Sequence, residues 1–150
     1  KIFILLCYFL NLLGMFQRLT MVGVDRLECA PEYEDRDMPA IGREVMERAR
    51  PFGNRALILH GDTVASARLV PPWLDFIFID AAHDTESVVA DINAWAPKIQ
   101  NDDGFIAGHD INLDSVREAV EKCFRDYRIL PDNVWVAEPI ALRADLADVA

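Results

Sequence analysis

The hydrophobic residues of this chain fall into short blocks that alternate with segments of helical periodicity. Four blocks predict β-strands, because apolar residues follow one another there without regular polar alternation. They span residues 20–25, 56–59, 74–79 and 105–108. Strands with this pattern are typical of a sheet that is covered on both faces. We therefore expect strands at these places that are buried on both sides.

Helices are expected between and after these strands. The predicted helices cover residues 40–49, 63–69, 85–99 and 113–124. The helix over 85–99 has the clearest periodicity, because its apolar residues recur every three or four positions. These residues are Val88, Ile92, Trp95 and Ile99. In the last predicted helix the inward residues are Val116, Val120, Cys123 and Phe124.

The order of these elements indicates the fold class. Strands that alternate with helices form right-handed βαβ units and hence a parallel sheet. Two further short strands, 127–130 and 134–137, are expected around the turn Pro131–Asn133. The chain is therefore expected to be an α/β protein with a doubly wound, mostly parallel sheet. A length of 150 residues fits one domain over residues 1–150.

The composition and the net charge limit the classes of partner that the chain is expected to bind. Just over half of the residues (52%) are hydrophobic, which is enough for a core, and the formal net charge is −10. A surface with this charge repels nucleic-acid backbones and anionic membranes, so we expect neither as a partner. The three cysteines form no CxxC pair. They are expected to be reduced, apolar fillers in a cytoplasmic protein.

The first 19 residues form an atypical apolar element. Residues 2–16 are strongly apolar, and the stretch after Lys1 is similar to the hydrophobic region of a signal peptide. It is shorter than the roughly 20 apolar residues that a membrane-spanning helix needs. No small-residue cleavage site clearly follows it. We favour a buried element of the fold over a targeting segment.

Polar residues follow directly after the predicted strands, where parallel sheets bind their ligands. Asp25 would accept hydrogen bonds from both hydroxyls of a ribose, and the alternative is a capping or turn aspartate. Gly61 would let a ligand ring approach the backbone, and Asp62 would accept a hydrogen bond from an exocyclic amine. The alternative is an ordinary helix cap by Asp62 or Thr63.

The strongest cluster comes from the next two strand ends. Asp80 and His83 follow one strand, and His109 and Asp110 follow the other. Two carboxylates and two imidazoles suit a divalent metal ion, or a general base with the group that orients it. The structural alternative is that Asp80 caps a helix and His83 bonds to a backbone carbonyl.

These segments resemble a known family. Residues 75–92 are similar to the "FIDxxHxYExVxxDL" segment of small class I S-adenosylmethionine-dependent methyltransferases, and residues 95–110 resemble their "hLKPGGhhxxHD" segment. Residues 20–25 are similar to the second strand of that family with its ribose-binding acid. Residues 61–63 are similar to its "GDS" motif. The resemblance covers roughly residues 15–125.

The resemblance implies a Rossmann-like sheet with a reversed final hairpin and methyl transfer to a small-molecule acceptor. It implies S-adenosyl-L-methionine as cofactor, with Mg²⁺ or another divalent cation as a second expected ligand. The implied cofactor-binding residues are Asp25, Gly61, Asp62, Thr63 and Asp80. The implied metal ligands are Asp80, His109 and Asp110. The implied catalytic residues are His83, His109 and Asp80.

One motif of the family is missing from the chain. Its first strand leads into a glycine-rich loop of the type "ExGxxxGxS", whereas residues 1–13 contain no glycine and Gly14 stands alone. We therefore expect a first strand and loop that are truncated or diverged. An impaired methyltransferase-like module that binds or assembles with a partner, including a homo-oligomer, is the alternative. A dinucleotide oxidoreductase is disfavoured by the same missing loop and by the lack of a Tyr-x-x-x-Lys pair.

Overall fold

The structure is a computed structural model that describes residues 19–27, 37–100 and 103–138. The chain forms two compact units, residues 1–66 and residues 67–150. The expectation of a single domain over residues 1–150 stays a prediction. The atypical N-terminal element lies outside the described residues except for Leu19, so it also stays a prediction.

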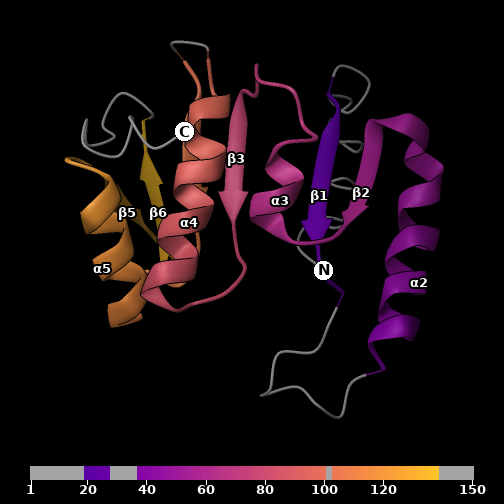
Figure 1. Ribbon diagram of the computed structural model, residues 1–150, viewed down its shortest axis with the longest axis horizontal. Helices are drawn as coiled ribbons and strands as arrows, with labels where there is room; N and C mark the ends of the chain where they lie inside the picture. The colour runs from indigo at the N-terminus through magenta and orange to yellow at the C-terminus, as the bar shows by residue number, and fades with distance from the viewer. Residues whose placement is uncertain (1–18, 28–36, 101–102, 139–150) are drawn as a thin grey trace. The chain divides into compact units, whose positions relative to one another are not determined.

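The first unit contains a two-stranded parallel sheet. Strand β1 (Met21–Asp25) pairs with β2 (Ala56–His60), and Asp25 lies opposite His60 at the end of the ladder. Between the strands come helix α2 (Met38–Ala49) and a 3-10 turn (Arg50–Arg55), and α3 (Thr63–Ala67) follows β2 (Figure 1). A small core holds the unit together. Its buried residues are Ala49, Phe52 and Ala56, with Met21, Val45 and Ile58 packed against them.

Helix α2 begins two residues before its predicted start at Ala40. Asp37 caps the helix, because its carboxylate Oδ1 accepts a hydrogen bond from the backbone N–H of Ala40 at 2.9 Å. Pro39 lies in the first turn, where its missing N–H leaves no helical hydrogen bond unmade. The acidic loop residue Asp37 therefore has a structural role.

The second unit contains a four-stranded mixed sheet. Its strands are β3 (Phe76–Ile79), β4 (Phe105–Gly108), β5 (Arg128–Leu130) and β6 (Val134–Ala137), in the spatial order β3-β4-β6-β5. The β3–β4 pair is parallel, whereas the β4–β6 and β5–β6 pairs are antiparallel. The predicted reversed hairpin at the end of the sheet is thus confirmed, and so is the α/β fold class.

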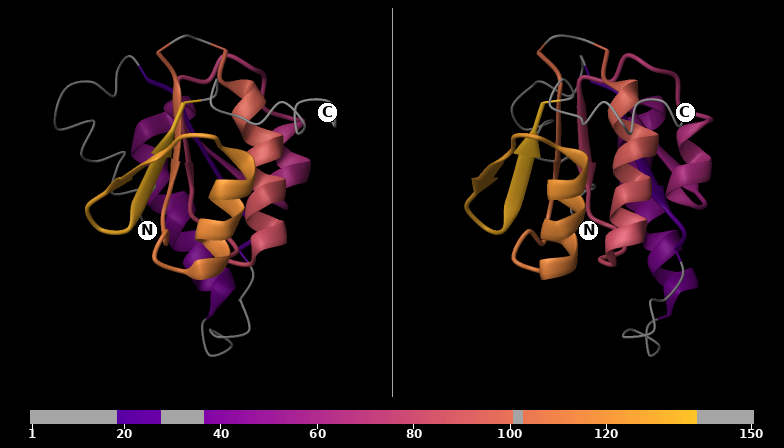
Figure 2. Two further views of the ribbon diagram at one scale, coloured as in Figure 1. Left: turned by 90° about the vertical axis from the view of Figure 1, so that its left-hand side faces the viewer. Right: turned by 60° about the vertical axis from the view of Figure 1, so that its left-hand side comes forward.

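Two helices cover one face of this sheet. Helix α4 (Thr85–Trp95) and helix α5 (Asp114–Cys123) lie on the same side of it in both views of Figure 2. All the predicted inward residues of these two helices are buried, including Cys123 as an apolar filler. Among the residues that the structure describes, no helix is long and apolar enough to cross a membrane.

Burial of β3 on both faces, as predicted from its sequence, is wrong. Ile77 is buried, but Phe76 and Phe78 on the opposite face remain 40% and 37% exposed. Successive residues of a strand point to opposite faces, and α4 and α5 cover one of them. The rings of Phe76 and Phe105 pack against each other on the other face, with centroids 4.7 Å apart.

Two element boundaries also differ from the prediction. The helix expected over residues 85–99 ends at Trp95 and continues as a 3-10 turn, Ala96–Lys98, which contains Pro97. The strand expected to begin at Leu74 is regular only from Phe76, because Trp73 has a φ of 81° and Leu74 forms only an isolated bridge.

Candidate active site

The second unit brings Asp80 and His109 together at the ends of two neighbouring strands. Strands β3 and β4 are parallel, and their last residues, Ile79 and Gly108, lie opposite each other. The backbone N–H of His109 donates to the carbonyl of Ile79 at 3.1 Å and extends the ladder by one step. The next residue after each strand therefore leaves the sheet at the same edge.

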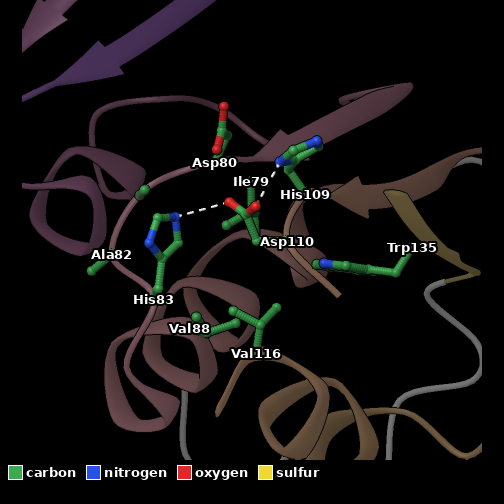
Figure 3. Close-up of a pocket in the computed structure, with 10 residues that line it drawn as sticks. Ile79, Asp80, Ala82, His83, Val88, His109, Asp110, Val116 and Trp135 are labelled. Carbon is green, nitrogen blue, oxygen red and sulfur yellow. Dashed lines mark ion pairs between the residues drawn. The ribbon is translucent and has the colours of Figure 1, made fainter. Parts of the chain in front are cut away.

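Asp110 lies between two histidines. Its Oδ2 is 3.0 Å from Nε2 of His83, and its Oδ1 is 3.0 Å from Nδ1 of His109 (Figure 3). The backbone of Asp110 has a φ of 60°, a left-handed conformation that aspartate and asparagine adopt more readily than most residues. This turn directs the carboxylate back toward both imidazoles.

These side chains border a small hollow. The hollow is partly open to solvent, and its volume of about 10 Å³ has room for about one water molecule. Its polar lining comes from the segments that follow β3 and β4, and its apolar lining comes from the end of β3 and the loop after it, from the helices and from β6 (Figure 3). The polar residues are Asp80, His83, His109 and Asp110, and the apolar ones include Val88, Val116 and Trp135.

Three of the polar residues are arranged as ligands for a metal ion. One ligand atom each from Asp80, His109 and Asp110 lies within 4.8 Å of the other two. Two carboxylates and an imidazole are a donor set that divalent cations accept. A cation would compete with the two histidines for the oxygens of Asp110, because both oxygens already have imidazole nitrogens beside them.

The loop that carries His83 is anchored to α5. The hydroxyl of Ser115 donates to the carbonyl of His83 at 2.6 Å, and the hydroxyl of Thr85 donates to the carbonyl of Ser115 at 3.1 Å. Asp84 caps α4 by accepting from the N–H of Ser87 at 2.9 Å. These bonds fix the backbone that places the His83 imidazole beside Asp110.

The environment of His109 changes its protonation. Burial of the side chain, the largest influence, lowers the pKa of the imidazole. The hydrogen bond and charge of Asp110 and the charge of Asp80 raise it, and the net pKa lies above the ordinary value of 6.5. The folded state therefore binds a proton at His109 more tightly than the unfolded chain does.

This shift predicts a pH-dependent contribution to stability in the absence of divalent cations. The contribution is fully present below pH 6.5 and is lost as the pH rises through the raised pKa of the folded state. Urea unfolding with a chelator would measure it in the wild type and in Asp110→Asn. The stability difference between the two proteins should be larger at acidic pH, and a difference that grows with pH would contradict the assignment.

The first unit brings together the other predicted residues. The carboxylate Oδ1 of Asp25 accepts from the backbone N–H of Leu27 at 2.7 Å, and the carbonyl of Asp25 accepts from the N–H of Gly61 at 3.0 Å. Among the residues that the structure describes, a Cβ atom added to Gly61 would meet the hydroxyl of Ser66 at 3.4 Å, an ordinary van der Waals contact. Thr63 is the first residue of α3.

The side chain of Asp62 makes one contact that was not anticipated. Its Oδ1 accepts a hydrogen bond from the N–H of Ala65 at 2.9 Å. Asp62 therefore caps α3, as the structural alternative predicted. Its Oδ2 forms an ion pair with Arg26. The hydrogen bond from Arg26 and that from Ala65 hold the pKa of the Asp62 carboxyl below its usual value. The carbonyl of Arg26 is itself fixed by His60, whose Nε2 lies 2.6 Å away.

Each unit thus assembles one group of predicted residues. Whether the two groups border one crevice stays a prediction. Sequence reasoning missed Arg26, Ser115 and the position of Trp135 in the hollow. Arg26 offered one signal, since it directly follows the strand-end residue Asp25.

Solved structures share this fold. Two structures of CalS11, a TDP-rhamnose 3′-O-methyltransferase of calicheamicin biosynthesis, match 79% of the chain with TM-scores of 0.53 and 0.55 and 16% identity. The chain spans only 57% and 60% of their length. MycE, a methyltransferase of the mycinamycin pathway solved with Mg and SAH, matches 83% of the chain at a TM-score of 0.50 and 14% identity, over 38% of its own length.

The sequence itself matches a family. A search of curated proteins finds no matching sequence. Residues 5–111, however, match the sequence model of the family described as a methyltransferase domain, which is more than two thirds of the chain. This match covers β1 to β4 and includes the strand-end residues of both units. The chain therefore belongs to the methyltransferase-domain family, as its resemblance to class I S-adenosylmethionine-dependent methyltransferases implied.

Proposed function

We propose that this protein transfers the methyl group of S-adenosylmethionine to a small-molecule acceptor, with a divalent cation at the acceptor side. The observation that carries the proposal is the convergence of Asp80, His83, His109 and Asp110 at two adjacent strand ends, in a chain of the methyltransferase-domain family. The presence of SAH and Mg in the MycE structure supports the pairing of this cofactor with a cation.

The first unit would hold the adenosine part of the cofactor. The Asp25 carboxylate would accept hydrogen bonds from the ribose hydroxyls, and Asp62 would accept one from the exocyclic amine of adenine. The absence of a side chain at Gly61 would let the ring approach the backbone. Thr63 would add a hydroxyl at the start of α3, next to Asp62.

The second unit would hold the acceptor. Asp80, His109 and Asp110 would bind the cation, which lowers the pKa of a bound hydroxyl. Asp110 orients the imidazole of His83, which would take the acceptor proton near neutral pH. In the transfer step a bond forms between the acceptor oxygen and the methyl carbon. The carbon–sulfur bond breaks, and its electron pair goes to the sulfonium, which becomes a thioether.

Calorimetric titration of the purified chain tests the proposal. S-adenosylmethionine should bind with a Kd tighter than about 1 mM, which corresponds to about −4 kcal/mol. Mg²⁺ should also bind to the chain in a separate titration. The Asp110→Asn substitution should weaken this binding of Mg²⁺. A wild-type chain that binds no cofactor at about 1 mM would refute the proposal and favour the impaired binding or assembly module.

A further inference from the structure

The turns that follow β1 and β2 are joined by an ion pair. Arg26 is the first residue after β1, and Asp62 is the second residue after β2. Because the strands are parallel and Asp25 lies opposite His60, the two turns leave the sheet side by side. The guanidinium of Arg26 reaches across and pairs with the Oδ2 atom of Asp62.

The backbone holds Arg26 in position for this contact. The carboxylate of Asp25 accepts from the N–H of Leu27 at 2.7 Å and closes a tight turn in which Leu27 has a φ of 52°. The imidazole of His60 is bound to the carbonyl of Arg26 at 2.6 Å. Both bonds hold the peptide group that joins Arg26 to Leu27, whereas the Arg26 side chain is exposed and reaches Asp62 alongside the proposed cofactor residues.

The two oxygens of Asp62 have separate tasks. Oδ1 caps α3 through the N–H of Ala65, so it belongs to the structure of the helix. Oδ2 pairs with Arg26, and it is the oxygen that the helix cap leaves open to an exocyclic amine. A guanidinium and an amine are both hydrogen-bond donors, and they would compete for this oxygen.

We propose that Arg26 determines the affinity of this site, by occupying the Asp62 oxygen that the adenine amine needs. The inference rests on the proposed function. Cofactor binding then requires the guanidinium to leave Asp62, so the ion pair lowers the affinity for the cofactor. The pair suits this role because its side chains are 61% and 37% exposed, and exposed pairs are weak enough to open.

Arg26→Met tests the inference, because methionine keeps much of the apolar stem and removes every donor. S-adenosylmethionine should bind this variant roughly two- to fivefold more tightly than the wild type, the ratio expected from loss of one exposed ion pair. Arg26→Lys retains the charge and should bind nearly as the wild type does. Calorimetry on the full chain measures all three affinities.

The matched control is Arg48→Met. Arg48 forms an ion pair with Glu44 on α2, in the same unit, and its side chain is 60% exposed, close to that of Arg26. This variant should leave the cofactor affinity unchanged. A similar gain in affinity in Arg48→Met would show that the effect of Arg26 is general electrostatics, and would overturn the inference.

Salt provides a second measurement. Raising the ionic strength from about 0.1 M to about 1 M shortens the Debye length from about 10 Å to about 3 Å and loosens exposed pairs. The affinity difference between wild type and Arg26→Met should therefore shrink at high salt. Weaker binding by Arg26→Met would mean that the guanidinium contacts the ligand favourably, for example by stacking on the adenine, and would overturn the inference.

The outcomes separate this inference from the proposed function. Equal affinities in wild type and Arg26→Met overturn the inference and leave the proposed function standing. No binding by either protein overturns both. Binding by Arg26→Met alone would support the inference, because it would show that the wild-type site is closed by its own arginine, and it would refute the proposed activity of the wild-type chain.

Discussion

Replacement of Asp110 by asparagine is expected to slow methyl transfer by about 10²–10⁴-fold, the range found when a positioned proton-transfer group is lost. The same variant should weaken cation binding by at least about tenfold to a hundredfold. Both effects arise because one carboxylate serves three purposes. It is a predicted cation ligand, it orients His83 from 3.0 Å, and it holds His109 from 3.0 Å.

Asparagine is the informative substitution at this position. The φ of 60° at Asp110 would strain most side chains, but asparagine adopts the left-handed region at least as readily as aspartate. The variant therefore removes the charge and keeps the turn. Thermal unfolding by circular dichroism would check that the fold is kept, and titration calorimetry with Mg²⁺ and a methyl-transfer assay would measure the two losses.

Two further variants sharpen this test. Asp126→Asn removes an exposed carboxylate in the same unit and should leave both quantities unchanged. His83→Gln should lower the transfer rate without weakening cation binding, because His83 is outside the three-residue ligand set. Full activity of Asp110→Asn would show that neither the cation nor the oriented imidazole takes part in the reaction.

The helices and strands could be predicted from the sequence because the spacing of apolar residues along a short segment depends on which of its faces is buried. The strand over residues 105–108 and the hairpin strands around residues 131–133 were found almost to the residue. The exposure of Phe76 and Phe78 could not be found in this way. An apolar side chain can be buried, but the sequence does not say whether a helix covers it. The number of helices that cover each face of the sheet is decided by tertiary packing.

In the candidate site, too, some features could be predicted from the sequence and others depend on tertiary contacts. Asp80, His109 and Asp110 were found because parallel strands deliver the residues after them to one edge, and this rule needs only the strand boundaries. The bond from Ser115 to the His83 carbonyl spans 32 positions, and that from Arg26 to Asp62 spans 36. Polar residues of these types are common, so nothing in the sequence marked those particular pairs.

Truncation of Trp135 to alanine is expected to cost the second unit about 3–5 kcal/mol in the free energy of unfolding. Trp135 is 1% exposed in the middle of β6, and its ring lies 5.9 Å from that of Phe124, centroid to centroid. It also packs directly on Gly108, where an added Cβ would lie 2.6 Å from the indole. The substitution would thus leave a cavity between α5 and the sheet.

Urea unfolding followed by far-ultraviolet circular dichroism measures this loss, and Trp73→Ala is its matched control. Trp73 is 72% exposed, so its truncation should change stability by no more than about 0.5 kcal/mol. Because Trp135 also lines the hollow beside His109 and Asp110, Trp135→Ala should weaken Mg²⁺ binding as well. A loss of stability below about 1 kcal/mol would contradict the packing, since a fully buried indole leaves more space than its neighbours can fill by relaxing.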